Sequence, residues 1–129
     1  MKFLGTGSAL PKKVVSNDDL AQVMDTSDEW IRPRTGIGMR HIAVEETTTS
    51  MAVEAAEEAL ADAKISGCEI DLIIAGTISP DYIFPSLACE VQAAIGAKSA
   101  TAFDLSAGCS GFLFALATAD AYFRTGRDK

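Results

Sequence analysis

The stretch Thr-Ala-Phe-Asp-Leu-Ser-Ala-Gly-Cys-Ser-Gly-Phe, residues 101–112, decides the fold of this chain. Its first half predicts a short buried strand, and residues 112–123 predict an apolar helix. Between the two, Gly108 and Gly111 bracket Cys109. Small residues on both sides of a nucleophile let the backbone turn sharply and expose the side chain at the end of a strand. The stretch therefore predicts a strand, a tight turn and a helix, with Cys109 at the turn.

Two interpretations of Cys109 follow from this local pattern. Free cysteines are among the most buried residue types and often pack as small hydrophobic side chains. A thiol at the N-terminus of a helix lies instead in the positive end of the helix dipole, which favours the nucleophilic thiolate. The residues around Cys109 leave both interpretations open.

The composition indicates a single domain from a reducing compartment. The chain has 129 residues, of which 48% are hydrophobic and 22% charged, enough for one core and too few for two. Neither a membrane span of about 20 apolar residues nor a signal peptide is visible, so we expect a cytoplasmic location away from membranes. Cys68, Cys89 and Cys109 lack the spacing of a disulfide framework or a metal site. The net charge of −7 argues against general nucleic-acid binding.

Helices and strands alternate in the second part of the chain. Residues 48–64 predict an amphipathic helix with an alanine-rich face, and residues 86–95 predict a second helix. Between them, residues 72–75 form a continuous apolar run, as in a parallel strand covered on both faces. With the strand and helix around Cys109, this order predicts a layered α/β fold. Residues 112–123 are apolar nearly all round, which predicts a helix buried on every side. The other predicted elements of these 129 residues are too few to cover the whole surface of such a helix.

The first part of the chain predicts shorter elements. We expect a strand at residues 2–4 and a helix at residues 18–24 capped by Asn17. Gly5 and Gly7 are not followed by a third glycine and a helix, which excludes a dinucleotide-binding loop.

A further short helix is expected around the only tryptophan, Trp30. Thr26 and Glu29 have the spacing of a capping box, and the helix should stop before Pro33. The spacing places Trp30 within about a turn of arginines, including Arg34. Such a cluster suits an adenine nucleotide, because the ring can stack on the base while guanidinium groups bind phosphate oxygens. The alternative is the commoner one of a core tryptophan flanked by surface arginines.

Taken together, these motifs resemble the N-terminal part of the 3-oxoacyl-(acyl-carrier-protein) synthase III family, a branch of the thiolase superfamily. The matching segments are Gly5–Gly7 with Pro11, Asp25–Ile31, Arg34–Ile37, Phe84–Ser86 with Cys89 and Gln92, and Ala102–Phe112. The resemblance implies a thiolase-like layered α/β/α fold. It also implies that residues 1–129 are a partial N-terminal domain, with the C-terminal half absent.

The resemblance further implies an acyltransferase that initiates fatty-acid synthesis. Cys109 would be the catalytic nucleophile that accepts a short acyl group, such as acetyl, from acyl-CoA. The acyl group would then undergo Claisen condensation with malonyl-acyl-carrier protein. Thr26, Trp30 and Arg34 would bind coenzyme A, and Phe84 would reach across a homodimer into the partner's acyl pocket. No cofactor or metal is implied, because acyl-CoA is a substrate.

The chain also departs from this family in length. Family members are more than twice as long, and their general acid/base histidine and asparagine lie in the second half. His41 is the only histidine and aligns with the nucleotide-binding region, so it is not assigned that role. We therefore expect the 129 residues alone to be inactive in condensation. Two alternatives stay open: a type III relative performing another acyl transfer in secondary metabolism, and a non-catalytic partner subunit.

Overall fold

The computed structural model describes residues 2–126, which divide into two compact units. The first comprises Met1–Ala9 and Thr47–Lys129 and is here called the sheet unit. The second, Leu10–Glu46, is called the hairpin unit. No helix in the described part of the chain is long and apolar enough to cross a membrane.

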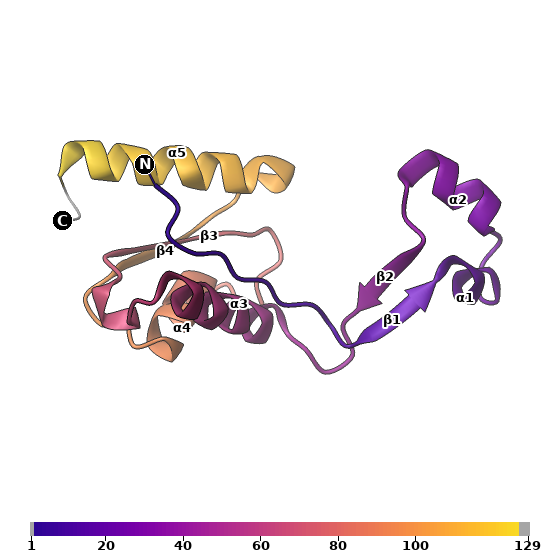
Figure 1. The fold of residues 1–129 in the computed structure, drawn as a ribbon, viewed down its shortest axis with the longest axis horizontal. Helices are drawn as coiled ribbons and strands as arrows, with labels where there is room; N and C mark the ends of the chain where they lie inside the picture. Colours follow the sequence, from indigo (N-terminus) through magenta and orange to yellow (C-terminus); the bar gives the residue numbers. More distant parts are fainter. Residues whose placement is uncertain (1, 127–129) are drawn as a thin grey trace. The chain divides into compact units, whose positions relative to one another are not determined.

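The sheet unit has three layers, as the sequence predicts. Strands β3 (Leu72–Gly76) and β4 (Thr101–Leu105) pair in parallel, with Leu72 opposite Thr101. Helices α3 (Thr48–Ala63) and α4 (Leu87–Ala94) cover one face of this sheet, and α5 (Gly111–Thr125) covers the other (Figure 1). The predicted α/β/α order is therefore confirmed within this unit. Single 3₁₀ turns, η1 (Gly67–Glu69) and η2 (Gly108–Ser110), precede β3 and α5.

The core of the sheet unit centres on α4. Its buried hydrophobic residues are Leu87, Ala88 and Val91 of this helix, together with Ala97 just after it. Helix α5, by contrast, keeps large apolar side chains exposed, among them Phe112, Leu113, Phe114 and Phe123. This exposure agrees with the expectation that residues 1–129 cannot cover a helix that is apolar on nearly every side.

The expected strand at residues 2–4 is wrong. This segment forms no strand, and its continuation lies along α3. The backbone N–H of Thr6 donates to Asp62 at 2.9 Å, and that of Ser8 donates to Glu58 at 2.5 Å. A short apolar run becomes a strand only where a partner strand shares its hydrogen bonds, and the residues that follow this run are bonded to the side chains of a helix instead.

The hairpin unit consists of two strands and two short helices. Strand β1 (Lys13–Ser16) pairs antiparallel with β2 (Met39–Ile42), and α1 (Asn17–Ala21) and α2 (Asp28–Thr35) lie between them in sequence.

The predicted caps of both helices are wrong by one residue. Ser16, not Asn17, caps α1, and Ser27, not Thr26, caps α2 by accepting the N–H of Trp30 at 3.1 Å. Helix α2 also continues through Pro33. Two contacts support its last turn: the N–H of Gly36, which has a φ of +74°, donates to the carbonyl of Arg32, and the hydroxyl of Thr35 donates to the carbonyl of Ile31.

Candidate active site and nucleotide-binding cluster

Cys109 lies in the turn η2, between the end of β4 and the start of α5. Its side chain is exposed, which favours the reactive interpretation over the packed one. Gly108, immediately before it, has a φ of +52°, a conformation that glycine adopts without strain. The predicted strand, turn and helix are all present, and the helix begins two residues after the thiol.

Close backbone contact fixes the far side of this turn. A Cβ atom on Gly76, at the end of β3, would lie 3.1 Å from the carbonyl carbon of Gly111, the first residue of α5. Helix α5 therefore starts directly against the neighbouring strand. This contact holds the segment that carries Cys109 at the end of the sheet.

The residues predicted to bind a nucleotide lie together in the hairpin unit. Trp30 is 56% exposed, so it is not the core tryptophan of the alternative interpretation. The guanidinium carbon of Arg34 lies 4.7 Å from the centre of the Trp30 ring, and its Nη1 donates to the carbonyl of Trp30 at 2.9 Å. Thr26 shares a pocket of about 320 Å³ with Asp25, Ser27 and Trp30.

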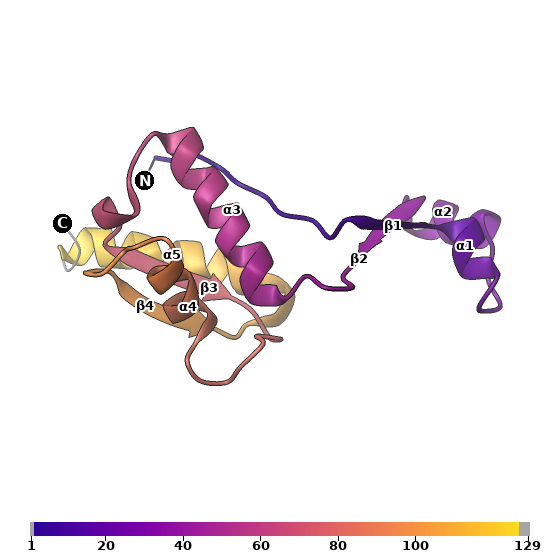
Figure 2. The same cartoon turned by 90° about the horizontal axis from the view of Figure 1, so that it is seen from below.

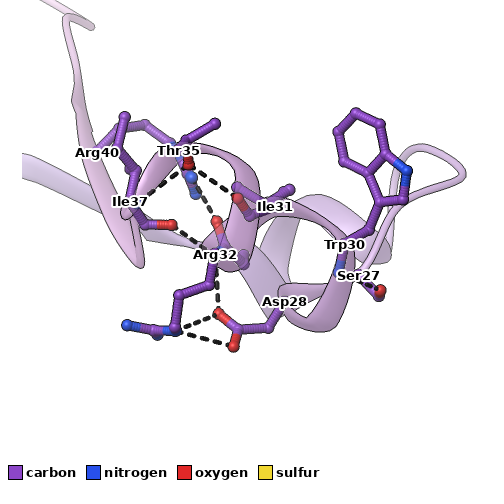
Figure 3. Close-up of polar contacts among 9 residues, drawn as sticks. Ser27, Asp28, Trp30, Ile31, Arg32, Thr35, Ile37 and Arg40 are labelled. Atoms are coloured by element: carbon purple, nitrogen blue, oxygen red, sulfur yellow. Dashed lines mark hydrogen bonds and ion pairs between the residues drawn. The ribbon is translucent and has the colours of Figure 1, made fainter.

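A hydrogen-bond network that sequence reasoning missed lies beside this cluster. The Nε of Arg32 donates to both oxygens of Asp28, at 3.2 and 3.0 Å (Figure 3). Asn17, only 1% exposed, donates from its amide to Asp28 at 2.7 Å and to the carbonyl of Ile37 at 2.9 Å. The Asn17 carbonyl accepts from Arg40. The hydrogen bond from Arg32, followed by that from Asn17, lowers the pKa of Asp28.

Phe84 belongs to the loop between β3 and α4 and is 89% exposed. Figure 2 shows the course of this loop between the two elements. The loop is anchored by Asp81, whose carboxylate accepts the backbone N–H groups of Thr48 at 3.1 Å and Thr49 at 2.7 Å. These bonds at the start of α3, that from Thr49 first, lower the pKa of Asp81 to about 2. The neighbouring Ile83 is 98% exposed, so the loop presents an apolar tip.

Comparison with known proteins finds related sequences and structures that share one description. The family profile described as 3-oxoacyl-[acyl-carrier-protein (ACP)] synthase III matches residues 103–129, which include Cys109. A beta-ketoacyl-[acyl-carrier-protein] synthase III from Bordetella petrii is 58% identical over 129 residues, covering 95% of this chain and 39% of the relative. The crystal structure of 3-oxoacyl-[acyl-carrier-protein] synthase III from Aquifex aeolicus is 55% identical, with a TM-score of 0.96, over 99% of this chain and 42% of that one.

The chain matches the N-terminal part of 3-oxoacyl-[acyl-carrier-protein] synthase III. It spans about two fifths of the length of these relatives. Its fold is accordingly the thiolase-like layered α/β/α fold of the synthase III family, present in part. The same fold occurs in the priming beta-ketosynthase from the R1128 polyketide biosynthetic pathway, which is 38% identical, with a TM-score of 0.94, over 99% of this chain and 39% of that one.

Within residues 2–126, no group of three or more histidine, cysteine, aspartate or glutamate side chains could hold a metal ion. The roles of Cys109, Thr26, Trp30, Arg34 and Phe84 stay predictions, because a similarity of whole chains does not test individual residues. The division of residues 1–129 into one partial domain likewise stays a prediction.

Proposed function

We propose that the protein carrying this chain initiates fatty-acid synthesis by joining a short acyl group, such as acetyl, to malonyl-acyl-carrier protein. The observation that carries this proposal is the exposed Cys109 at the turn between β4 and α5, in a chain that matches the synthase III family. A thiol in that position has both access to a substrate and the favourable end of a helix dipole.

In the first step, the Cys109 sulfur attacks the thioester carbonyl of acyl-CoA. A new carbon–sulfur bond forms at Cys109, the bond to the coenzyme A sulfur breaks, and coenzyme A leaves as a thiolate that takes up a proton. Thr26, Trp30 and Arg34 bind the nucleotide part of this substrate. The exposed ring of Trp30 and the guanidinium group above it offer a stacking surface and a positive charge.

In the second step, malonyl-acyl-carrier protein loses carbon dioxide by breaking a carbon–carbon bond. The electron pair left behind forms an enolate, whose carbon attacks the acyl carbonyl on Cys109. The new carbon–carbon bond releases Cys109 as a thiolate. Stabilising the enolate requires hydrogen-bond donors, and removal of one such donor typically costs about 10²–10³ in rate.

Phe84 is proposed to shape the acyl pocket of a homodimer. Its exposure at the tip of an anchored loop leaves its ring free to contact a second subunit. The protein is further proposed to act in the cytoplasm, with acyl-CoA and the carrier protein as partners and without a cofactor, nucleic acid or membrane.

Acylation of the full polypeptide tests the role of Cys109. After incubation with acetyl-CoA, peptide mass spectrometry should find the acetyl group on Cys109, and Cys109→Ala should abolish both labelling and condensation. Cys68→Ala is the matched control, since Cys68 is also an exposed cysteine, and it should leave both unchanged. Labelling of Cys68 or Cys89 in place of Cys109, or no labelling at all, would contradict the proposal.

The 129 residues alone are proposed to lack condensing activity. Their only histidine, His41, donates from Nδ1 to the carbonyl of Pro11 at 2.6 Å, within the hairpin unit. An assay of the purified 129-residue chain with acetyl-CoA and malonyl-acyl-carrier protein should therefore show no condensed product, and measurable turnover would contradict this expectation.

A second candidate is priming of another acyl-transfer pathway through the same Cys109. The match to the priming beta-ketosynthase of the R1128 pathway favours it, because that protein shares 38% identity over nearly the whole chain. Profiling of acyl-CoA donors and carrier-protein acceptors with the full polypeptide separates the two candidates. A non-catalytic subunit would keep its function in the Cys109→Ala variant.

A further inference from the structure

Asn17 is the one large side chain that is fully buried in the described part of the chain. Burial of an amide costs free energy unless its donors and acceptor are paired. Here both donor hydrogens and the acceptor are used, towards Asp28, Ile37 and Arg40. The partners lie 11, 20 and 23 residues along the chain, so Asn17 joins three separate segments of the hairpin unit.

The network acts on the helix that carries Trp30. Asp28 is the first residue of α2, and its carboxylate is shared between Asn17 and Arg32, one turn further along the helix. Arg40 extends the network to β1, since its Nη1 donates to the carbonyl of Val15 at 3.1 Å. The first turn of α2 is therefore bound to both strands of the hairpin through a single buried amide.

Gly38 provides the space that this network needs. A Cβ atom at Gly38 would lie 2.5 Å from the Arg32 guanidinium group, so any larger residue would displace Arg32. The Asn17 backbone N–H also donates to the carbonyl of Gly38, at 3.2 Å. Trp30 and Arg34 belong to the same helix but take no part in the ion pair of Asp28 and Arg32. Figure 3 shows the Trp30 ring pointing away from that pair.

We propose that Asn17 is a positioning residue for the nucleotide part of acyl-CoA. It fixes the start of α2, and so keeps Trp30 and Arg34 in the orientation in which they bind the substrate. This inference rests on the proposed function, because it assumes that acyl-CoA is the substrate.

Two acyl donors separate this role from a general effect on folding. Acyl-CoA carries the nucleotide, whereas the corresponding acyl-pantetheine thioester has the same reacting end and lacks the nucleotide. In the full polypeptide, Asn17→Asp should raise the KM for acyl-CoA about tenfold, the effect expected for loss of one hydrogen bond to a charged group. The kcat, and the rate of Cys109 acylation by acyl-pantetheine, should stay unchanged.

The substitution keeps the shape of Asn17 and its acceptor for Arg40, but it places a second carboxylate against Asp28. Gln22→Ala is the matched control, because Gln22 is exposed at the end of α1. This variant should leave unchanged both the KM for acyl-CoA and the rate of Cys109 acylation by acyl-pantetheine. If Asn17→Asp does not fold, Arg40→Lys should give the same selective rise in the KM for acyl-CoA, of smaller size.

If the Asn17 variant lost activity equally with acyl-CoA and acyl-pantetheine, or lost none with either, the positioning role would be overturned. The wild-type protein distinguishes this failure from that of the proposed function. If neither donor acylates wild-type Cys109, the proposed function itself is wrong.

Discussion

At the scale of the residue, two glycines decide how closely the N-terminal segment approaches α3. A Cβ atom on Gly7 would lie 2.0 Å from the carbonyl oxygen of Ala55, and one on Gly5 would lie 2.5 Å from that of Ala59. The alanines of α3 supply the matching small surface. The sequence excludes a dinucleotide loop here, and the close contact with a helix backbone gives the physical reason for both glycines.

Substitution of Gly7 should therefore destabilise the sheet unit. In Gly7→Ala the added methyl group overlaps the helix backbone, and overpacking of this kind typically costs roughly 1–3 kcal/mol. Urea unfolding measures the change. Gly111→Ala is the control, because a Cβ atom there would lie 3.5 Å from its nearest neighbour, which is an ordinary contact. The stability of this variant should be close to that of the wild type. Equal stability of the two variants would contradict the packing seen at Gly7.

At the scale of the element, the apolar periodicity locates each helix, but the ends depend on which side chain reaches the free N–H groups. The cap of α3 is Thr47, whose hydroxyl accepts the N–H of Ser50 at 3.0 Å. Two side chains accept the free backbone N–H groups at the N-terminus of α4. Ser86 accepts the N–H of Cys89, and Asp104 of β4 accepts those of Leu87 and Ala88. The second contact links a strand to a helix, and nothing in the local sequence of α4 predicts it.

We expect Asp104 to stabilise the pairing of α4 with the sheet. Its two oxygens accept hydrogen bonds at 2.9 and 2.8 Å in a half-buried position. Asp104→Ala leaves two N–H groups without these acceptors, which should lower the free energy of unfolding by about 1–3 kcal/mol. Thermal unfolding followed by circular dichroism measures this. Asp71→Ala, an exposed aspartate beside β3, should change stability by less than about 0.5 kcal/mol. A comparable loss in both variants would show that the effect does not come from the α4 contact.

At the scale of the whole molecule, the sequence predicts the sheet unit better than the hairpin unit. Helix α3 and strand β3 have apolar patterns of their own, so each can be located without knowledge of its partner. Strand β1 has four residues and no such pattern, and its extended form depends on pairing with β2. The failed strand at residues 2–4 has the same cause, since strand formation there requires a partner that the sequence does not reveal.

The same distinction applies to the candidate site. Trp30 and Arg34 are four residues apart on one helix, so their spacing alone predicts that they lie together. Asn17 and Arg40 are 23 residues apart and meet only through the pairing of β1 with β2, which explains why the buried network was not predicted. Residues that meet through tertiary pairing need the structure.

Each of the two units contains a carboxylate with a pKa of about 2, and this predicts how the molecule responds to acid. In the hairpin unit, Glu46 accepts the backbone N–H groups of Lys12 at 3.0 Å and Val44 at 3.1 Å, which joins the two ends of the unit. These bonds, that from Lys12 first, lower its pKa from 4.5 to about 2. In the sheet unit, Asp81 is lowered from 3.8 to about 2 by the start of α3.

The direction of the effect follows from proton binding. Below its ordinary pKa, each carboxylate takes up a proton in the unfolded chain while the folded chain keeps the charge, so the unfolded state binds more protons. The stabilisation is complete above about pH 4.5 and is lost as the pH falls towards 2. Trp30 is the only tryptophan of the 129-residue chain, so its fluorescence during urea unfolding reports on the hairpin unit. Glu46→Gln should weaken the loss of stability between these pH values, because glutamine has no proton to gain, whereas Glu45→Gln should retain the wild-type dependence. An identical pH dependence in both variants would mean that Glu46 does not hold the ends of the hairpin unit through its charge.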